Sequence, residues 1–338
     1  MKEIFKKMRI ASKNTLRFLG LVSLPLVAAT VMKAIACLTD LNYATGYFEL
    51  GVLSTISAYI VAAICIASFS YLFISKGQVP VSKPSGPLSF VPAGLSSVAA
   101  LFLSAELFSE LFGSLSGEEI GISAPLTLAL AITSLLAAVA FFLIIYYEHR
   151  EDTRKAAYGI AAAIFFAAYA AYLYFDNSTP LNSPSKIADQ MAYLASAAFF
   201  LYETRISLGR SHWRSHTAFG IMAAAVSLYA SVPALVVFFA KGILITKSLA
   251  STVLVLALGL FALARVILFS TSDVEEEPST VRTVRILAKN RIEELNAGIT
   301  HERSRGVAED GQIGENYEIK IPSENEASST ENKEESAE

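Results

Sequence analysis

Eight long apolar stretches, separated by short polar segments, alternate along the first 270 residues of the chain. They cover residues 18–39, 50–74, 88–113, 122–147, 156–175, 186–208, 217–240 and 248–270. Each is close to the roughly 20 residues that an α-helix needs to cross the hydrocarbon core of a bilayer. None alternates apolar and polar residues in the way that the strands of a membrane barrel do. The pattern predicts an all-α integral membrane protein, a bundle of about eight transmembrane helices over residues 18–270.

The composition agrees with this pattern. Hydrophobic residues make up 54% of the 338 residues and charged residues 17%, with a mean hydropathy of +0.49, well outside the usual range of soluble globular proteins. The lipid bilayer is therefore the first expected partner, in the plasma or cytoplasmic membrane. Cys37 and Cys65 lie inside predicted helices, where a thiol behaves as a small apolar group. We expect no disulfide from them.

Basic residues predict the orientation of the helices. Segment 1–17, the loops after the second and fourth stretches and the region around the end of the sixth stretch, from Arg205 to Arg214, hold 14 Lys and Arg residues, whereas the opposite side holds three: Lys186, Lys241 and Lys247. Lys and Arg are retained on the cytoplasmic side of a membrane. Both termini are therefore predicted to be cytoplasmic.

The two ends of the chain differ from the helical part. Residues 1–17 mix basic and apolar side chains, which is typical either of a basic amphipathic segment on an anionic leaflet or of a simple topogenic flank. Residues 271–338 contain 17 acidic and 8 basic residues, and within them 279–298 has the spacing of a short amphipathic helix. The remainder is too polar to bury a core. We expect a disordered, acidic cytoplasmic tail, which offers a surface for a protein partner.

Five polar residues form a candidate intramembrane cluster near the predicted outer ends of the helices. Glu106 and Glu110 are four residues apart and share one helix face, so either one carries a proton or a cation lies between them. Lys33 lies at a similar depth and is the expected partner, and Asp189 and Gln190 complete the cluster. The alternative is that the helix ends early and leaves both glutamates in interfacial water.

Glu203 and Arg265 are a candidate ion pair between two helices near the cytoplasmic side. Each lies about five residues from the predicted end of its helix, so their depths match within about one turn. Arg265 alone could instead extend its charge to the headgroups. Small residues four apart, Ala188, Ala192 and Ser196, predict that the helix carrying Glu203 is central and closely packed.

A metal site is the weakest chemical signal in the sequence. His212 and His216 are four apart and could bind a metal together with Glu148 or Asp152, His149 lying beside them. The aromatic residues around these histidines favour simple anchoring at the interface. We find no nucleotide-binding motif and no nucleic-acid module. The expectation is a protein that is not an enzyme and that carries no cofactor or metal.

Two classes of function remain open. Acids near the outer leaflet, together with Pro25, Pro92 and Pro233 inside helices, favour a transporter or permease for a small solute or cation. The long tail favours a membrane scaffold or sensor. A membrane enzyme with a metal site on its cytoplasmic face is a distant third. Transport predicts a cavity that reaches Glu106, whereas a scaffold predicts a dry bundle packed with alanine.

Overall fold

The computed structural model describes residues 2–43, 45–74, 87–115, 124–146, 154–176, 180, 182–207 and 213–271, with side chains from Thr15 onward except at 74, 87, 114–115, 144–146, 154–156 and 207. These residues all belong to a unit that runs over Met1–Glu276. The predictions for the tail, including the amphipathic helix at 279–298, lie outside the described residues. The same holds for the side chains of the basic N-terminal segment before Thr15.

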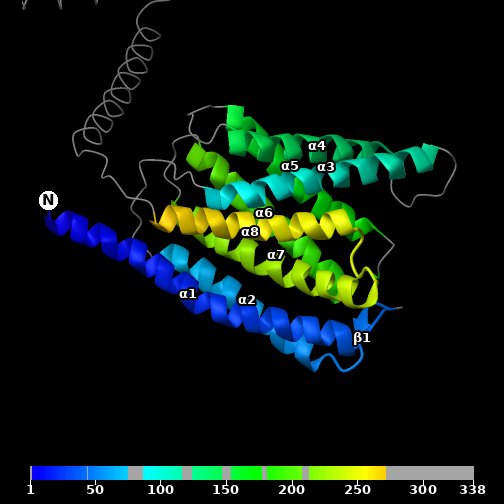
Figure 1. Ribbon diagram of the computed structural model, residues 1–338, viewed down its shortest axis with the longest axis horizontal. Helices are drawn as coiled ribbons and strands as arrows, with labels where there is room; N and C mark the ends of the chain where they lie inside the picture. The colour runs from blue at the N-terminus through cyan, green and yellow to red at the C-terminus, as the bar shows by residue number, and fades with distance from the viewer. Residues whose placement is uncertain are drawn as a thin grey trace, which may run out of the picture. The chain divides into compact units, whose positions relative to one another are not determined.

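Eight α-helices make up nearly all of the described chain (Figure 1). The helical membrane bundle predicted from the sequence is therefore confirmed. Seven of the described helices are long and apolar enough to cross a membrane, and α6, whose apolar stretch is bordered by Asp189, Gln190 and Glu203, is not one of them. The bounds are Lys2–Thr39 (α1), Val52–Ile74 (α2), Pro87–Leu115 (α3), Ala124–Tyr146 (α4), Arg154–Phe175 (α5), Pro184–Ser207 (α6), Trp213–Lys241 (α7) and Leu249–Thr271 (α8).

The helices lie roughly along one direction in three groups. In the view of Figure 1, α3, α4 and α5 lie on one side, α1 and α2 lie on the other side, and α6, α7 and α8 lie between them. α1 and α2 pack together and against α7, while α3 packs against α4 and α8. α6 packs against α5, α7 and α8 through one face, and its opposite face is exposed at Ile187, Met191, Leu194 and Leu201. The buried small residues Ala188, Ala192 and Ser196 agree with the predicted close packing of this helix, whereas its exposed face places it at the edge of the bundle instead of the predicted centre.

A short β-hairpin joins α1 to α2. Its strands, β1 (Leu41–Asn42) and β2 (Tyr47–Phe48), pair antiparallel, with Leu41 opposite Phe48. The carboxylate of Asp40 accepts hydrogen bonds from the backbone amides of Leu50 and Gly51, at 2.9 and 2.8 Å, which fixes the start of α2. We call this end of the bundle the hairpin end. It also holds the last turns of α3, α5 and α7 and the first turns of α4, α6 and α8.

Rings and alanines fill the core between α4, α5, α6 and α8. Phe141 packs edge to face against Phe200 and Phe261, and Phe166 packs against Phe200, with ring centroids 5.2 to 5.8 Å apart. Alanine at most other buried positions lets the helix backbones approach closely. The result is a tightly packed middle of the bundle.

Three helices contain proline, as the sequence indicated. Pro25, Pro92 and Pro233 lie inside α1, α3 and α7, and each helix continues past its proline. The prolines therefore do not divide these helices into separate halves, so they lend no weight to a transport mechanism that depends on broken helices.

Candidate functional site

One face of α6 carries a row of mostly polar side chains into the interior of the bundle. Their spacing of three and four residues keeps them on a single helix face. Each has 8% or less of its surface exposed. We call this row the α6 stripe, and its members are Lys186, Asp189, Tyr193, Ser196, Phe200 and Glu203.

A lysine from the segment between α7 and α8 organises the hairpin end. Lys247 forms an ion pair with Glu110 of α3 at 3.2 Å and lies 3.9 Å from Asp176, just after α5. It also donates to the hydroxyl of Tyr172 and lies over that ring, and the same hydroxyl donates to Glu110 at 2.7 Å. Three separate parts of the chain are thereby joined around one ammonium group.

The stripe begins beside this group at a small cavity. Lys186 of α6 donates to the backbone carbonyl of Asp176 at 2.5 Å, so two lysines converge on the end of α5. The cavity has a volume of about 10 Å³, which is room for about one water molecule. Its walls are Leu173, Lys186, Asp189, Ile245, Thr246 and Lys247.

Asp189 and Lys33 are opposite charges that approach each other without touching. Lys33 reaches from α1 to the ring of Tyr229, with its ammonium 4.1 Å from the ring centroid. It lies within electrostatic range of Asp189, and both side chains are buried. Within the described part of the chain, Asp189 makes no hydrogen bond and no ion pair. A buried carboxylate with no donor is an unusual arrangement.

The residues of the cluster predicted from the sequence make different contacts from the expected ones. Glu110 pairs with Lys247, in place of the expected Lys33, and Lys33 faces Asp189 instead. Both glutamates lie inside α3, which continues to Leu115, and Glu106 is exposed on its surface. Gln190 has a buried amide nitrogen with no hydrogen-bond partner among the described residues. The cavity reaches Asp189 and is not lined by Glu106.

Farther along the α6 stripe, hydroxyl groups replace charges. Tyr193 shares a hydrogen bond of 2.8 Å with Ser251 of α8. The hydroxyl oxygens of Ser196 on α6 and Ser227 on α7 are buried and, among the described residues, have no hydrogen-bond partner. The middle of the bundle therefore contains polar groups that the packing alone leaves unsatisfied.

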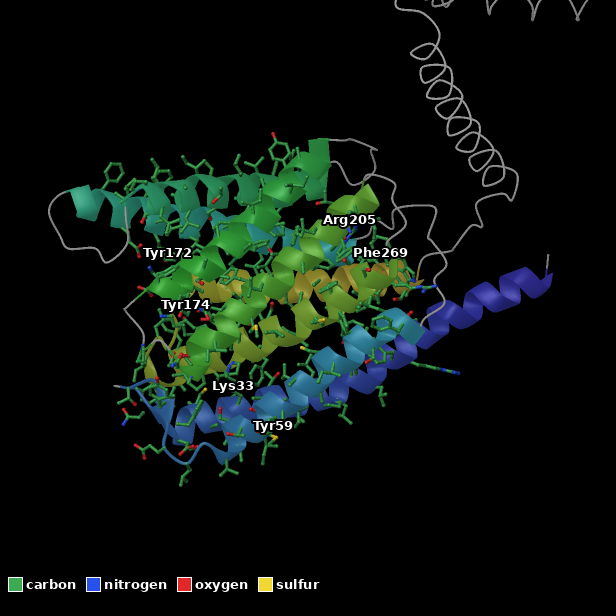
Figure 2. All side chains as sticks on the ribbon, turned by 180° about the vertical axis from the view of Figure 1, so that it is seen from behind. Lys33, Tyr59, Tyr172, Tyr174, Arg205 and Phe269 are labelled. Atoms are coloured by element: carbon green, nitrogen blue, oxygen red, sulfur yellow. The ribbon has the colours of Figure 1, made fainter. Side chains whose placement is uncertain are left out.

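At the opposite end, the stripe finishes in a fully paired acid. Glu203 accepts hydrogen bonds from Arg265 of α8, at 3.1 Å from Nε and 2.5 Å from Nη2. Its other oxygen lies 2.5 Å from Nε2 of His216 on α7. The predicted pair is thus in contact, and the alternative of Arg265 reaching the headgroups alone does not describe its buried position. Phe269, beside both Arg265 and His216, lies far along the bundle from Tyr172 (Figure 2).

His216 has a different place from the one suggested by the metal hypothesis. It is fully buried in α7, between the rings of Phe199 and Phe269, with Nε2 directed to Glu203. In the part of the chain that the structure describes, no group of three potential metal ligands comes together. The other residues of that hypothesis, His149, His212, Glu148 and Asp152, lie outside the described residues.

Several site residues were missed at the level of sequence. Lys186 and Lys247 look like ordinary loop charges, and nothing in the sequence links Tyr172 or Asp176 to them, or His216 to Glu203. One signal was available: the polar positions of 186–203 recur every three or four residues through an apolar stretch. That spacing marks a polar face on a helix that is otherwise apolar.

The comparisons with known proteins supply no relative from which a function could be transferred. No family model matches the chain, and no curated protein and no solved structure matches it. The function is therefore argued from the geometry of the described residues.

Proposed function

We propose that the protein is a transporter or permease for a small polar solute, which it binds at the hairpin end. The observation that carries this proposal is the α6 stripe. It leads from a cavity lined by Lys186, Asp189 and Lys247 into the middle of the bundle. Ionisable residues inside membrane proteins commonly mark the path of a substrate or an ion.

The free-energy cost of burying charges supports the same proposal. An ionisable side chain costs about 2.5–3.5 kcal/mol at the centre of a membrane helix on insertion scales, and less toward the helix ends, where the charges of α6 lie. α6 carries Lys186, Asp189 and Glu203 on its buried face, and two buried serine hydroxyls beside the path have no described partner. A helix that served only to pack against its neighbours would be more stable with alanine at these positions. A path for polar solutes would account for the polar side chains of the α6 stripe, because they would form hydrogen bonds with the solute.

The charges suggest the kind of solute. Three lysines and three acids meet at the hairpin end, so the site has no large excess of either sign: Lys33, Lys186, Lys247, Glu110, Asp176 and Asp189. A small solute with charged or strongly polar groups would exchange hydrogen bonds with them. The present cavity accommodates about one water molecule, so binding of a solute requires the hairpin end to open.

Cysteine accessibility tests whether the stripe becomes a watery path. Ser196 and Ala197 are adjacent, equally deep and both buried, but only Ser196 lies on the stripe. In a background with Cys37→Ala and Cys65→Ala, Ser196→Cys should react with a charged, membrane-impermeant methanethiosulfonate, and Ala197→Cys should react far more slowly. Equal protection of both cysteines would count against transport along this face.

Uptake into proteoliposomes tests transport itself. Radiolabelled amino acids, sugars, nucleosides and inorganic phosphate are suitable probes, with protein-free liposomes as the baseline. At least one polar solute should enter faster with the protein present. Lys247→Met should reduce that uptake, whereas Glu106→Gln, a change in an exposed acid of α3, should not. Uptake that is the same with and without protein, for every probe, would contradict the proposal.

The competing function, a membrane scaffold or sensor, has one observation in its favour. The core between α4, α5, α6 and α8 is closely packed with rings and alanines, as a static bundle would be. A scaffold predicts neither uptake nor labelling of Ser196→Cys. Together the two experiments therefore separate these functions.

Reporter fusions decide from which side the hairpin end is reached. The charge distribution predicts that fusions at Gly117 and Ser183 report outside, and that fusions at Gln78 and Thr153 report inside. The hairpin end, beside Ser183, would then face outward. An outside signal at Thr153 would overturn this orientation.

A further inference from the structure

We propose that Asp189 is a proton-binding site, which takes up a proton from water in the cavity at the hairpin end. If the protein is a transporter, as proposed above, this proton is the ion that couples to solute movement, and this part of the inference rests on that proposed function. Three observations on the geometry carry the proposal: Asp189 is buried, it lines a cavity with room for a water molecule, and no described residue donates to it.

The carboxylate of Asp189 lacks a hydrogen-bond donor among the described residues. A buried carboxylate normally accepts hydrogen bonds or touches a positive charge, because taking it out of water is otherwise unfavourable. Asp189 has neither among the described residues, although it is only 7% exposed. Binding a proton removes the charge and supplies a hydroxyl that can donate to a water molecule in the cavity.

The surroundings set how readily the proton is exchanged. Asp189 is in electrostatic range of Lys33, whose ammonium has the ring of Tyr229 as its direct contact. Two interacting ionisable groups of this kind titrate as a pair. The charged and titratable groups around the site are Lys33 and Cys37 on α1, Glu106 and Glu110 on α3, Tyr169, Tyr172 and Asp176 at the end of α5, Lys186 and Tyr193 on α6, Tyr229 on α7, and Lys247 before α8.

The other acids near the membrane interior are less suited to this role. Glu110 already contacts Lys247 and Tyr172, and Glu203 is paired with Arg265 and His216. Protonating either one would break these contacts. The sequence placed the exchangeable proton on Glu106 or Glu110, but Glu106 is exposed and Glu110 is paired. Asp189 is the acid that gains from protonation.

The step itself is a simple transfer. A hydronium ion in the cavity gives its proton to one carboxylate oxygen of Asp189 and leaves as water, so that one O–H bond breaks and one forms. The reverse step returns the proton to water. No other reactant is needed.

Infrared difference spectroscopy of the full-length protein in liposomes measures the protonation of Asp189 directly and needs no solute. On a step from about pH 9 to about pH 6, which leaves ordinary carboxylates with a pKa of about 4 ionised, the C=O stretch of a newly protonated carboxyl should appear and should shift in deuterated buffer. Asp189→Asn should abolish this band. Glu106→Gln and Asp176→Asn, which alter neighbouring acids, should retain it. A band that persists in Asp189→Asn would overturn the proposal.

Two further variants keep the test decisive if Asp189→Asn does not fold. Asp189→Glu should keep the band at a changed frequency, and an unchanged band would assign it to another acid. Lys33→Met should shift the pH at which the band appears, whereas Lys241→Met should not. Lys241 is a matched control, because it also lies over a tyrosine ring, Tyr43, near the hairpin end. Because no solute is present, the band can be absent while uptake is observed, or the reverse. Proton binding at Asp189 and solute transport are therefore tested separately.

Discussion

The two ends of α6 each bury an acid close to a base, but they satisfy these acids in opposite ways. Glu203 receives two hydrogen bonds from Arg265 and lies in contact with His216, all within 3.1 Å. Asp189 faces Lys33 across a gap and has no described donor. Burial of a charge therefore does not by itself indicate function. The informative difference is whether neighbouring groups donate hydrogen bonds to the buried carboxylate and neutralise its charge, or leave the carboxylate accessible to water.

The bases differ in the same way. Arg265 offers a planar group with several donors, which fits a carboxylate from two directions. The face of its guanidinium group lies over the ring of Phe269, and the edge of the group donates hydrogen bonds to Glu203. Lys33 lies over the ring of Tyr229 and leaves the carboxylate untouched. Glu203, Arg265 and His216 thus form a closed ion-pair cluster that stabilises the fold, which we call the structural lock. The Asp189 end has the character of a site that exchanges a proton.

The largest effect should come from breaking the lock. Arg265→Met would leave the carboxylate of Glu203 buried with only His216 beside it. Removing one partner of a buried pair typically costs about 3–5 kcal/mol. We therefore expect a loss of this size in the free energy of unfolding, measured by denaturant titration in detergent micelles.

A double-mutant cycle provides the control for this prediction. Glu203→Gln combined with Arg265→Met should cost less than the sum of the single changes, because the second change removes the group that the first one left unpaired. A coupling energy near zero would show that Glu203 and Arg265 do not stabilise each other, and the contrast between the two ends would lose its basis.

Packing around the lock gives the next largest effect. Gly220 lies on α7 one turn after His216, and a Cβ there would lie 2.5 Å from Val266 Cγ2 and 3.2 Å from the ring of Phe199. Overpacking of this kind costs about 1–3 kcal/mol. Gly220→Ala should lower the unfolding free energy by that amount, measured as above.

The control for this change is another helical glycine. A Cβ added to Gly20 on α1 would have no atom within 4 Å, so Gly20→Ala should be neutral or slightly stabilising. If Gly220→Ala were equally harmless, the Glu203 end would be looser than its contacts indicate.

The sequence predicted the helices well because each one depends on a local property. A run of about 20 apolar residues has few alternatives in a membrane, so the eight helices followed from the residues alone. Glu203 and Arg265 could be matched by depth, because helical rise converts residue number into distance. Neither inference required knowledge of which helices are neighbours.

The site was harder to predict because its contacts depend on which helices pack together. Lys33 was assigned to the pair Glu106 and Glu110 by depth alone, but α1 packs against α7 while α3 packs against α8. Lys247 was counted as a loop charge, although the turn before α8 carries it to Glu110 and Tyr172. Depth is encoded along one helix, whereas lateral position is set by packing between helices.

A smaller effect is expected in the middle of the α6 stripe. Tyr193 shares a buried hydrogen bond with Ser251, and Tyr193→Phe removes the hydroxyl while keeping the ring. A single hydrogen bond typically contributes about 0.5–1.5 kcal/mol. The unfolding free energy should fall by about that amount, which lies between the effects at the two ends. A loss as large as that of Arg265→Met would show that the whole stripe is locked.

The smallest effect, and the sharpest test of the contrast, is expected for Asp189→Asn. Asparagine has nearly the same shape as aspartate but carries no charge. No described residue donates to Asp189, so the change leaves no donor stranded, and the unfavourable burial of a charge is removed. Lys33 keeps its contact with the ring of Tyr229. The unfolding free energy should therefore change by less than about 1 kcal/mol, below the loss expected when a buried group loses its partner. The matched change at the other end, Glu203→Gln, removes a charge that Arg265 and His216 both contact, and it should be clearly destabilising. If Asp189→Asn proved as harmful as Glu203→Gln, then Lys33 and Asp189 would form a structural pair as tight as the lock, and the exchangeable character of the hairpin end would have to be abandoned.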